Sequence, residues 1–65
     1  PVAGTDLQAG DRLYFDMKRV GRVSHTGIYL GNGMFIHAST NQGKVGIDSI
    51  LKPNYLRALV AARRD

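Results

Sequence analysis

Two apolar segments, residues 26–30 and 34–38, are separated by the sequence Gly31-Asn32-Gly33. Short apolar segments on either side of such a turn predict a β-hairpin, because Asn and Gly tolerate the positive φ values that a tight turn between twisted strands requires. An isolated hairpin is marginally stable in water, so the chain needs further strands and a layer over its apolar face.

The other segments fit a small sheet. Residues 12–15 are rich in strand formers, and residues 45–50 alternate between two faces. Pro53 favours the first position of a helix, which predicts one helical turn over residues 53–57. Residues 59–63 predict a last strand, although their alanines equally suit a helix. With a polar turn at residues 39–43, the pattern predicts an α+β fold: an antiparallel β-sheet with one short helical turn.

The chain is small and carries no covalent staple. A chain of 65 residues forms at most one domain, and domains of this size bury only about 60% of their unfolded surface. The absence of cysteine excludes a disulfide and a thiolate zinc site. The predicted helical turn is too short to cover the sheet. We therefore expect the covering helices to precede Pro1, in a longer protein that this sequence enters partway.

The charge is basic but selects no partner by itself. Nine Lys and Arg against five Asp and Glu give a net charge of +4, which favours an anionic partner such as nucleic acid, lipid headgroups or cell wall. A solvated surface with a basic tail explains the same charge. The basic residues are not interleaved with aromatic residues as in single-strand binders, and no apolar run approaches the roughly 20 residues of a membrane span. We expect neither nucleic-acid binding nor a membrane span.

The chain has two histidines, His25 and His37, and each lies in or beside one strand of the hairpin. A two-residue turn would place them on opposite faces of the sheet. A three-residue loop at 31–33 would place His37 opposite Gly27 and His25 opposite Ser39, with both rings on one face. The turn sequence permits both registers, but only the second builds a site, and we predict the second.

In that register the histidines are diagonal neighbours, whose Cβ atoms lie about 7–8 Å apart or less. One histidine oriented by another is the base-and-orienter pair of a nucleophilic triad, with the nucleophile missing. Gly27, directly opposite His37, is expected to leave open space over the backbone that a substrate or another side chain could enter. A metal site is a weaker reading, because zinc prefers three or four ligands and only carboxylates such as Asp16 or Asp48 remain. We predict no metal and no cofactor.

Four segments resemble, in order and spacing, the motifs of NlpC-type cell-wall cysteine peptidases, a branch of the papain-like peptidases. Residues 6–15, DLQAGDRLYF, resemble the family's D-L-x-P-G-D-L-V-F-F, with Ala9 replacing the usual proline. Residues 24–33, SHTGIYLGNG, resemble S-H-V-G-I-Y-L-G-N-G, and residues 35–39, FIHAS, match F-I-H-A-S. Residues 61–64, AARR, resemble the closing G-A-R-R.

The resemblance implies that residues 1–65 are the C-terminal part of a papain-like peptidase domain. It implies that His25 is the catalytic histidine and that His37 is the polar residue that orients it. The family's cysteine lies in an upstream D-C-S-G-F segment, which this chain lacks. The implied activity is hydrolysis of D-glutamyl–diamino acid linkages in peptidoglycan stem peptides, in the bacterial cell envelope or outside the cell. The upstream half is then a required partner, and the chain alone is expected to be inactive.

Two other hypotheses remain open at this point. A compact basic sheet can bind without catalysing, so the chain is alternatively a noncatalytic, SH3-like wall-binding or interaction module. Histidines on opposite faces and an exposed aromatic groove would favour that reading. The chain is also compatible with a family relative that works in a phage tail or a toxin, where the chemistry is shared but the setting differs.

Overall fold

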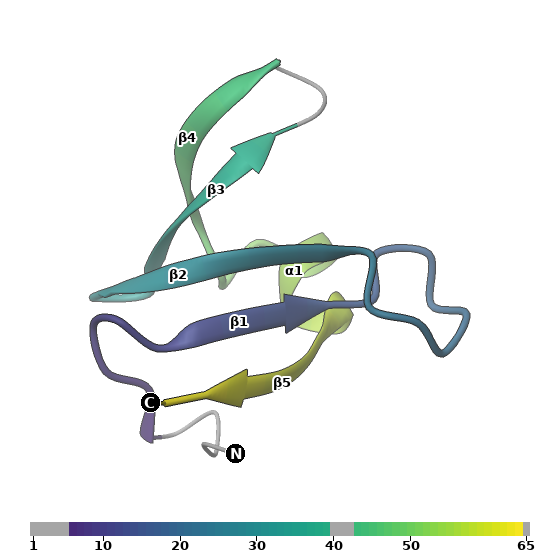
Figure 1. Ribbon diagram of the computed structural model, residues 1–65, viewed down its shortest axis with the longest axis horizontal. Coiled ribbons are helices and arrows are strands. Elements are labelled where there is room, and N and C mark those ends of the chain that lie inside the picture. The colour runs from purple at the N-terminus through teal and green to yellow at the C-terminus, as the bar shows by residue number, and fades with distance from the viewer. Residues whose placement is uncertain (1–5, 40–42, 65) are drawn as a thin grey trace.

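The computed structural model describes residues 6–39 and 43–64, and it shows one antiparallel sheet with a short helix (Figure 1). The elements in chain order are β1 (Arg12–Phe15), β2 (His25–Gly31), β3 (Met34–Ser39), β4 (Lys44–Ser49), α1 (Pro53–Ala58) and β5 (Leu59–Arg63). The strand order is β4-β3-β2-β1-β5. The predicted α+β fold is confirmed, and residues 59–63 form a strand. Of the predicted turn at 39–43, residues 40–42 lie outside the described part.

The β2–β3 connection corrects one prediction. The turn contains two residues, Asn32 and Gly33, with φ values of 55° and 79°. The extra residue lies in β2, where a bulge between Tyr29 and Gly31 shifts the register. Gly31 has a φ of 99°, as a glycine in such a bulge requires. Beyond the bulge the strands follow the predicted register. The predicted three-residue loop was therefore wrong, but the predicted faces of the side chains in β2 and β3 were right.

One face of the sheet carries the hydrophobic core. Its buried apolar side chains come from every strand except β4, from α1 and from the residue after β4: Leu13, Phe15, Tyr29, Phe35, Ile50, Ala58 and Ala62. Helix α1 lies against this face, behind the sheet in Figure 1. Its Tyr55 ring packs edge-on against Phe15 and Phe35. The helix therefore covers more of the core than the sequence led us to expect.

A bidentate ion pair joins the two ends of the described chain. Arg64 Nε and one of its terminal nitrogens donate to the two carboxylate oxygens of Asp11, each at 2.8 Å. The backbone N–H of Gln8 donates to the same carboxylate. The hydrogen bond from Arg64 is the main reason that the pKa of Asp11 is lowered to about 2. This pair fixes β5 beside β1.

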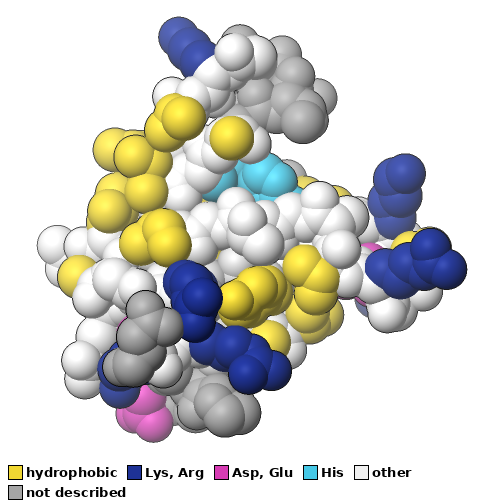
Figure 2. Space-filling model, in the orientation of Figure 1, with side chains coloured by type: hydrophobic (Ala, Val, Ile, Leu, Met, Phe, Trp, Pro, Cys, Tyr) yellow, Lys and Arg dark blue, Asp and Glu magenta, His cyan; other side chains and the backbone are white. Residues whose placement is uncertain are grey.

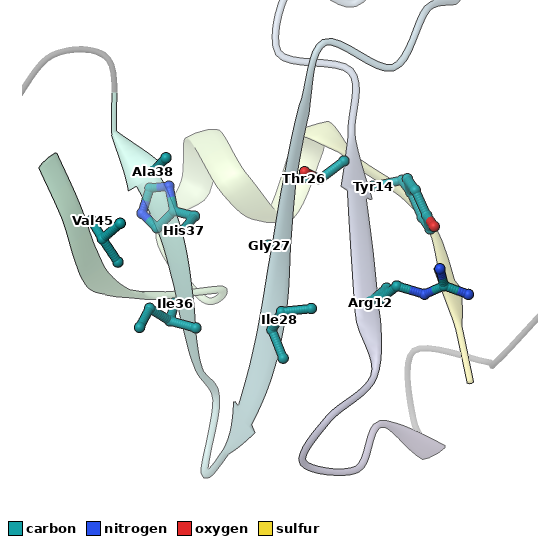
Figure 3. Close-up of a pocket in the computed structure, with 9 residues that line it drawn as sticks. All are labelled: Arg12, Tyr14, Thr26, Gly27, Ile28, Ile36, His37, Ala38 and Val45. Atoms are coloured by element: carbon teal, nitrogen blue, oxygen red, sulfur yellow. The ribbon is translucent and has the colours of Figure 1, made fainter. Parts of the chain in front are cut away.

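The opposite face of the sheet is apolar and exposed. It holds a shallow groove of about 390 Å³ lined by Arg12, Tyr14, Thr26, Ile28, Ile36, Ala38 and Val45, and bordered by Gly27 and His37, whose positions in the strands belong to the core face (Figure 3). Hydrophobic side chains gather on the face turned to the viewer in Figure 2. Within the described residues, no helix is long and apolar enough to cross a membrane.

We expect the isolated 65-residue chain to associate, or to fold poorly, because this outer face is not covered. Ile28, Ile47 and Val45 are 38%, 57% and 62% exposed, and monomers rarely keep contiguous apolar patches of several hundred Å² in water. Circular dichroism and sedimentation velocity test this expectation. A cooperative thermal transition in a homogeneous monomer would contradict it.

Candidate catalytic histidine pair

The two histidines meet on the core face of the sheet. His25 is the first residue of β2, and His37 lies within β3 opposite Gly46. His25 Nε2 lies 2.6 Å from His37 Nδ1, so one nitrogen donates a hydrogen bond and the other accepts it. The rings are nearly perpendicular, at 88°. The prediction that both rings lie on one face is confirmed.

An aspartate extends the pair on its buried side. His37 Nε2 lies 2.7 Å from Asp48 Oδ2, and Lys52 Nζ donates to the other carboxylate oxygen at 2.5 Å. The hydrogen bond from Lys52, followed by that from His37, lowers the pKa of Asp48 below its ordinary value. His25, His37 and Asp48 therefore form a hydrogen-bonded chain that ends on a carboxylate.

The role of Asp48 is not predictable from the local sequence. Alternation over residues 45–50 placed Asp48 and Gly46 on the same face of a strand. That face could be matched to His37 only through the β3–β4 register, in which Gly46 pairs with His37 and Asp48 with Phe35. The β2–β3 hairpin predicts that His25 and His37 share a face, but it does not predict which β4 residues lie beside them.

Asp16, the other carboxylate considered as a metal ligand, lies in a separate arrangement. Its two oxygens accept hydrogen bonds from the backbone N–H groups of Val20 and Gly21, at 3.1 and 2.7 Å, and so shape the loop after β1. Among residues 6–39 and 43–64, no group of three or more His, Cys, Asp or Glu side chains is placed to hold a metal ion.

Aromatic side chains seat the histidine pair. The Phe35 ring lies 4.5 Å from the His37 ring between centroids, and the edge of Tyr55 meets His37 at 5.5 Å. Phe15 lies 6.0 Å from His25. His37 is only 5% exposed, whereas His25 is half-buried. Burial, and then the electrostatic interaction with His37, lowers the pKa of His25, which favours a neutral imidazole at neutral pH.

The space over Gly27 is taken by another side chain, one of the two occupants expected from the sequence. A Cβ built on Gly27 would lie 2.8 Å from Phe35 Cδ2 and 3.0 Å from the Ile36 carbonyl oxygen. The space above Gly27 is therefore filled by the Phe35 ring and is not open to a substrate. The glycine instead lets the ring that packs on His37 lie close to the β2 backbone.

We expect Gly27→Ala to lower the free energy of unfolding by about 1–3 kcal/mol, the usual cost of overpacking. Neither the buried Phe35 ring nor the Ile36 carbonyl can move away without disturbing the sheet. Urea titration of a preparation that unfolds cooperatively measures the change. Thr26→Ala, on the exposed neighbour, is the control and should stay within about 0.5 kcal/mol. Equal stability of the two variants would contradict the packing role of Gly27.

A small hollow gives access to the pair. It has a volume of about 280 Å³ and is lined by Val23, Ser24, His25, Thr26 and Ala38. Figure 2 shows histidine side chains in a recess between the β3–β4 hairpin and the rest of the sheet. His25 Nδ1 has no hydrogen-bond partner among the described residues. An incoming group can therefore exchange a proton with His25, while His37 is held behind it.

Comparison with known proteins identifies relatives over almost the whole chain. The model of the NlpC/P60 family matches residues 2–64. The Escherichia coli K12 murein DD-endopeptidase MepS/murein LD-carboxypeptidase is 40% identical over 63 residues, which are 97% of this chain and 32% of the relative. The E. coli murein DD-endopeptidase MepH is 33% identical, over 98% of this chain and 24% of the relative. The Bacillus licheniformis peptidoglycan DL-endopeptidase CwlO is 35% identical, over 88% and 12%.

Solved structures agree with the fold. An NlpC/P60 family protein from Bacillus cereus superimposes with a TM-score of 0.84 at 34% identity, over 97% of this chain and 21% of that protein. A similar protein from Staphylococcus aureus gives a TM-score of 0.79 at 29% identity, over 98% and 21%. The chain thus spans a third or less of the length of these relatives. The family model, the relatives and the shared fold together show that this chain belongs to the NlpC/P60 family.

Proposed function

We propose that this chain supplies the catalytic histidine and its orienting histidine to a cysteine endopeptidase that hydrolyses D-glutamyl–diamino acid linkages in peptidoglycan stem peptides. The observation that carries the proposal is the 2.6 Å contact between His25 Nε2 and His37 Nδ1, with no hydrogen-bond partner for His25 Nδ1 among the described residues. The family and its relatives, which are named murein and peptidoglycan endopeptidases, support it. The chain would act in the bacterial cell envelope or outside the cell.

In the proposed mechanism His25 moves the protons. It takes the thiol proton of a cysteine from outside this chain, and the thiolate sulfur attacks the scissile carbonyl carbon. The protonated His25 then gives that proton to the leaving amine as the C–N bond breaks, which leaves a thioester. A water molecule next gives its proton to His25 and attacks the thioester carbonyl, and the proton returns to the sulfur as the thiol leaves.

The nucleophile must come from a different segment, because the chain has no cysteine. A helix N-terminus and a nearby imidazolium lower a thiol pKa to about 3.5–7.5, which explains the family's cysteine at the start of a helix. Ser24 and Thr26 flank His25, but neither lies at a helix N-terminus. The upstream half of the domain is therefore the partner that completes the site, and the chain alone should not turn over substrate.

The names of the relatives favour a second candidate linkage. Two E. coli relatives are DD-endopeptidases and the B. licheniformis relative is a DL-endopeptidase, so family membership is compatible with either stereochemistry. We retain the D-glutamyl–diamino acid linkage as the first proposal. A D,D cross-link between two stem peptides is the second.

The test uses a complete domain, meaning this chain preceded by the family's cysteine-bearing segment. The complete domain is incubated with a D-glutamyl–diaminopimelate peptide and, separately, with a D,D-cross-linked dimer, and the products are separated by chromatography. We expect cleavage of the first peptide, loss of cleavage after thiol alkylation, and none by the chain alone. Cleavage of only the dimer would select the second linkage. Tight binding to peptidoglycan without cleavage of either would support a wall-binding module instead.

A further inference from the structure

We propose that Asp48 is a positioning residue that fixes, through His37, the protonation pattern of His25. The site would then be a relay of three side chains and not a pair. The inference rests on the proposed function for its catalytic consequence, but its structural content concerns only which ring nitrogens carry protons. It assigns a role to a β4 residue that does not contact the reacting atoms.

The first step is the state of the Asp48 carboxylate. Lys52 Nζ donates to Oδ1 and His37 Nε2 lies 2.7 Å from Oδ2, and both contacts lower the pKa of Asp48. An ionised carboxylate has no proton to donate and only accepts. At neutral pH the nitrogen facing Oδ2 must therefore be the donor, so the proton of a neutral His37 resides on Nε2.

The second step follows within the His37 ring. A neutral imidazole has one N–H and one lone pair, so a His37 protonated at Nε2 carries its lone pair on Nδ1. That atom lies 2.6 Å from His25 Nε2 and therefore accepts a hydrogen bond from it. His25 is then protonated at Nε2, and its lone pair lies on Nδ1. This is the nitrogen that a thiol must reach.

The alternative pattern shows why the carboxylate matters. An amide in place of the carboxylate, as in Asp48→Asn, could donate its N–H to His37 Nε2 and move the His37 proton to Nδ1. His37 would then donate to His25 Nε2, and the His25 proton would lie on Nδ1, where it blocks the base. The orienting carboxylate of other catalytic triads holds a histidine directly. Here the Asp48 carboxylate would act on His25 indirectly, through the His37 ring that lies between them.

Nitrogen-15 long-range correlation NMR of the imidazole rings tests the inference in the complete domain. The unsubstituted protein should show both neutral histidines protonated at Nε2. Asp48→Asn should move protons to Nδ1 in at least part of the population and reduce kcat by about 10–100-fold, the usual range for supporting residues behind a site. KM should change little, because Asp48 does not face the hollow beside His25. Asp48→Glu, which keeps the carboxylate, should recover part of kcat.

Ser49→Ala is the matched control, since Ser49 follows Asp48 in β4 and, within the described part of the chain, its hydroxyl oxygen accepts a hydrogen bond from the backbone N–H of the exposed Leu51. It should leave both tautomers and kcat unchanged. Unchanged tautomers in folded Asp48→Asn would overturn the inference. If that variant does not fold, the unsubstituted domain decides, because a neutral His37 protonated at Nδ1 would overturn it equally. Absence of hydrolysis by the unsubstituted domain would count against the proposed function alone, because the tautomers are read without turnover.

Discussion

Replacement of His25 by alanine in the complete domain is expected to reduce kcat by roughly 10⁴–10⁶-fold, as loss of the base of a triad does elsewhere. His25 is the half-buried member of the pair and has a ring nitrogen, Nδ1, without a partner in the described structure. It is therefore the group that can take the thiol proton and return it to the leaving amine. Single-turnover kinetics with the D-glutamyl–diaminopimelate peptide measure the loss at the chemical step.

The control for this substitution is Leu30→Ala, at the other end of β2. Leu30 is exposed and does not line the hollow beside His25, so its truncation should change kcat by less than a few-fold. Thermal unfolding of both variants separates a lost base from a lost fold, because His25 packs near the buried Phe15 ring. Undiminished turnover in folded His25→Ala would exclude the role assigned to this residue.

The hairpin shows how far local sequence determines this fold. The Gly31-Asn32-Gly33 segment predicts a reversal of the chain, and two apolar segments on either side predict the strands. Whether the third flexible residue lies in the turn or in a bulge depends on small differences in backbone energy, and the sequence does not decide between them. The structure places it in β2. Both arrangements leave His25 and His37 on one face, which is why the site could be predicted although the loop was not.

Features that depend on contacts between distant elements were not fully predicted. Asp48 reaches His37 through the β3–β4 register, and Phe35 fills the space over Gly27 because of how a large ring packs in a small core. Neither arrangement leaves a periodic signal in the sequence. Helix α1 covers the core more fully than its length implied, because Tyr55 packs on three aromatic rings. Tertiary packing, rather than local propensity, decided each of these points.

The second large effect is expected for His37→Ala, which should reduce kcat by roughly 10²–10⁴-fold, the range for the orienting residue of other triads. His37 does not reach the substrate in this mechanism. In the proposed tautomer His37 Nδ1 accepts a hydrogen bond from His25 Nε2, and without the contact between these two atoms the His25 ring can rotate and take either tautomer. The loss should therefore be smaller than for His25→Ala, because a correctly placed His25 still occurs in part of the population.

A conservative variant separates this positioning role from packing. His37 is 5% exposed and lies against Phe35 and Tyr55, so alanine leaves a cavity and lowers stability whatever the ring does in catalysis. In His37→Gln, an amide oxygen can accept from His25 Nε2, which should restore part of kcat and much of the lost volume. Two results together would contradict the positioning role: His37→Gln regains stability but no activity, and His37→Ala loses as much kcat as His25→Ala. His37 would then itself transfer the proton between the thiol and the leaving amine. Full activity in folded His37→Ala would instead show that the contact between the two rings is structural. His25 would then act as the base without a hydrogen bond from its ring to residue 37.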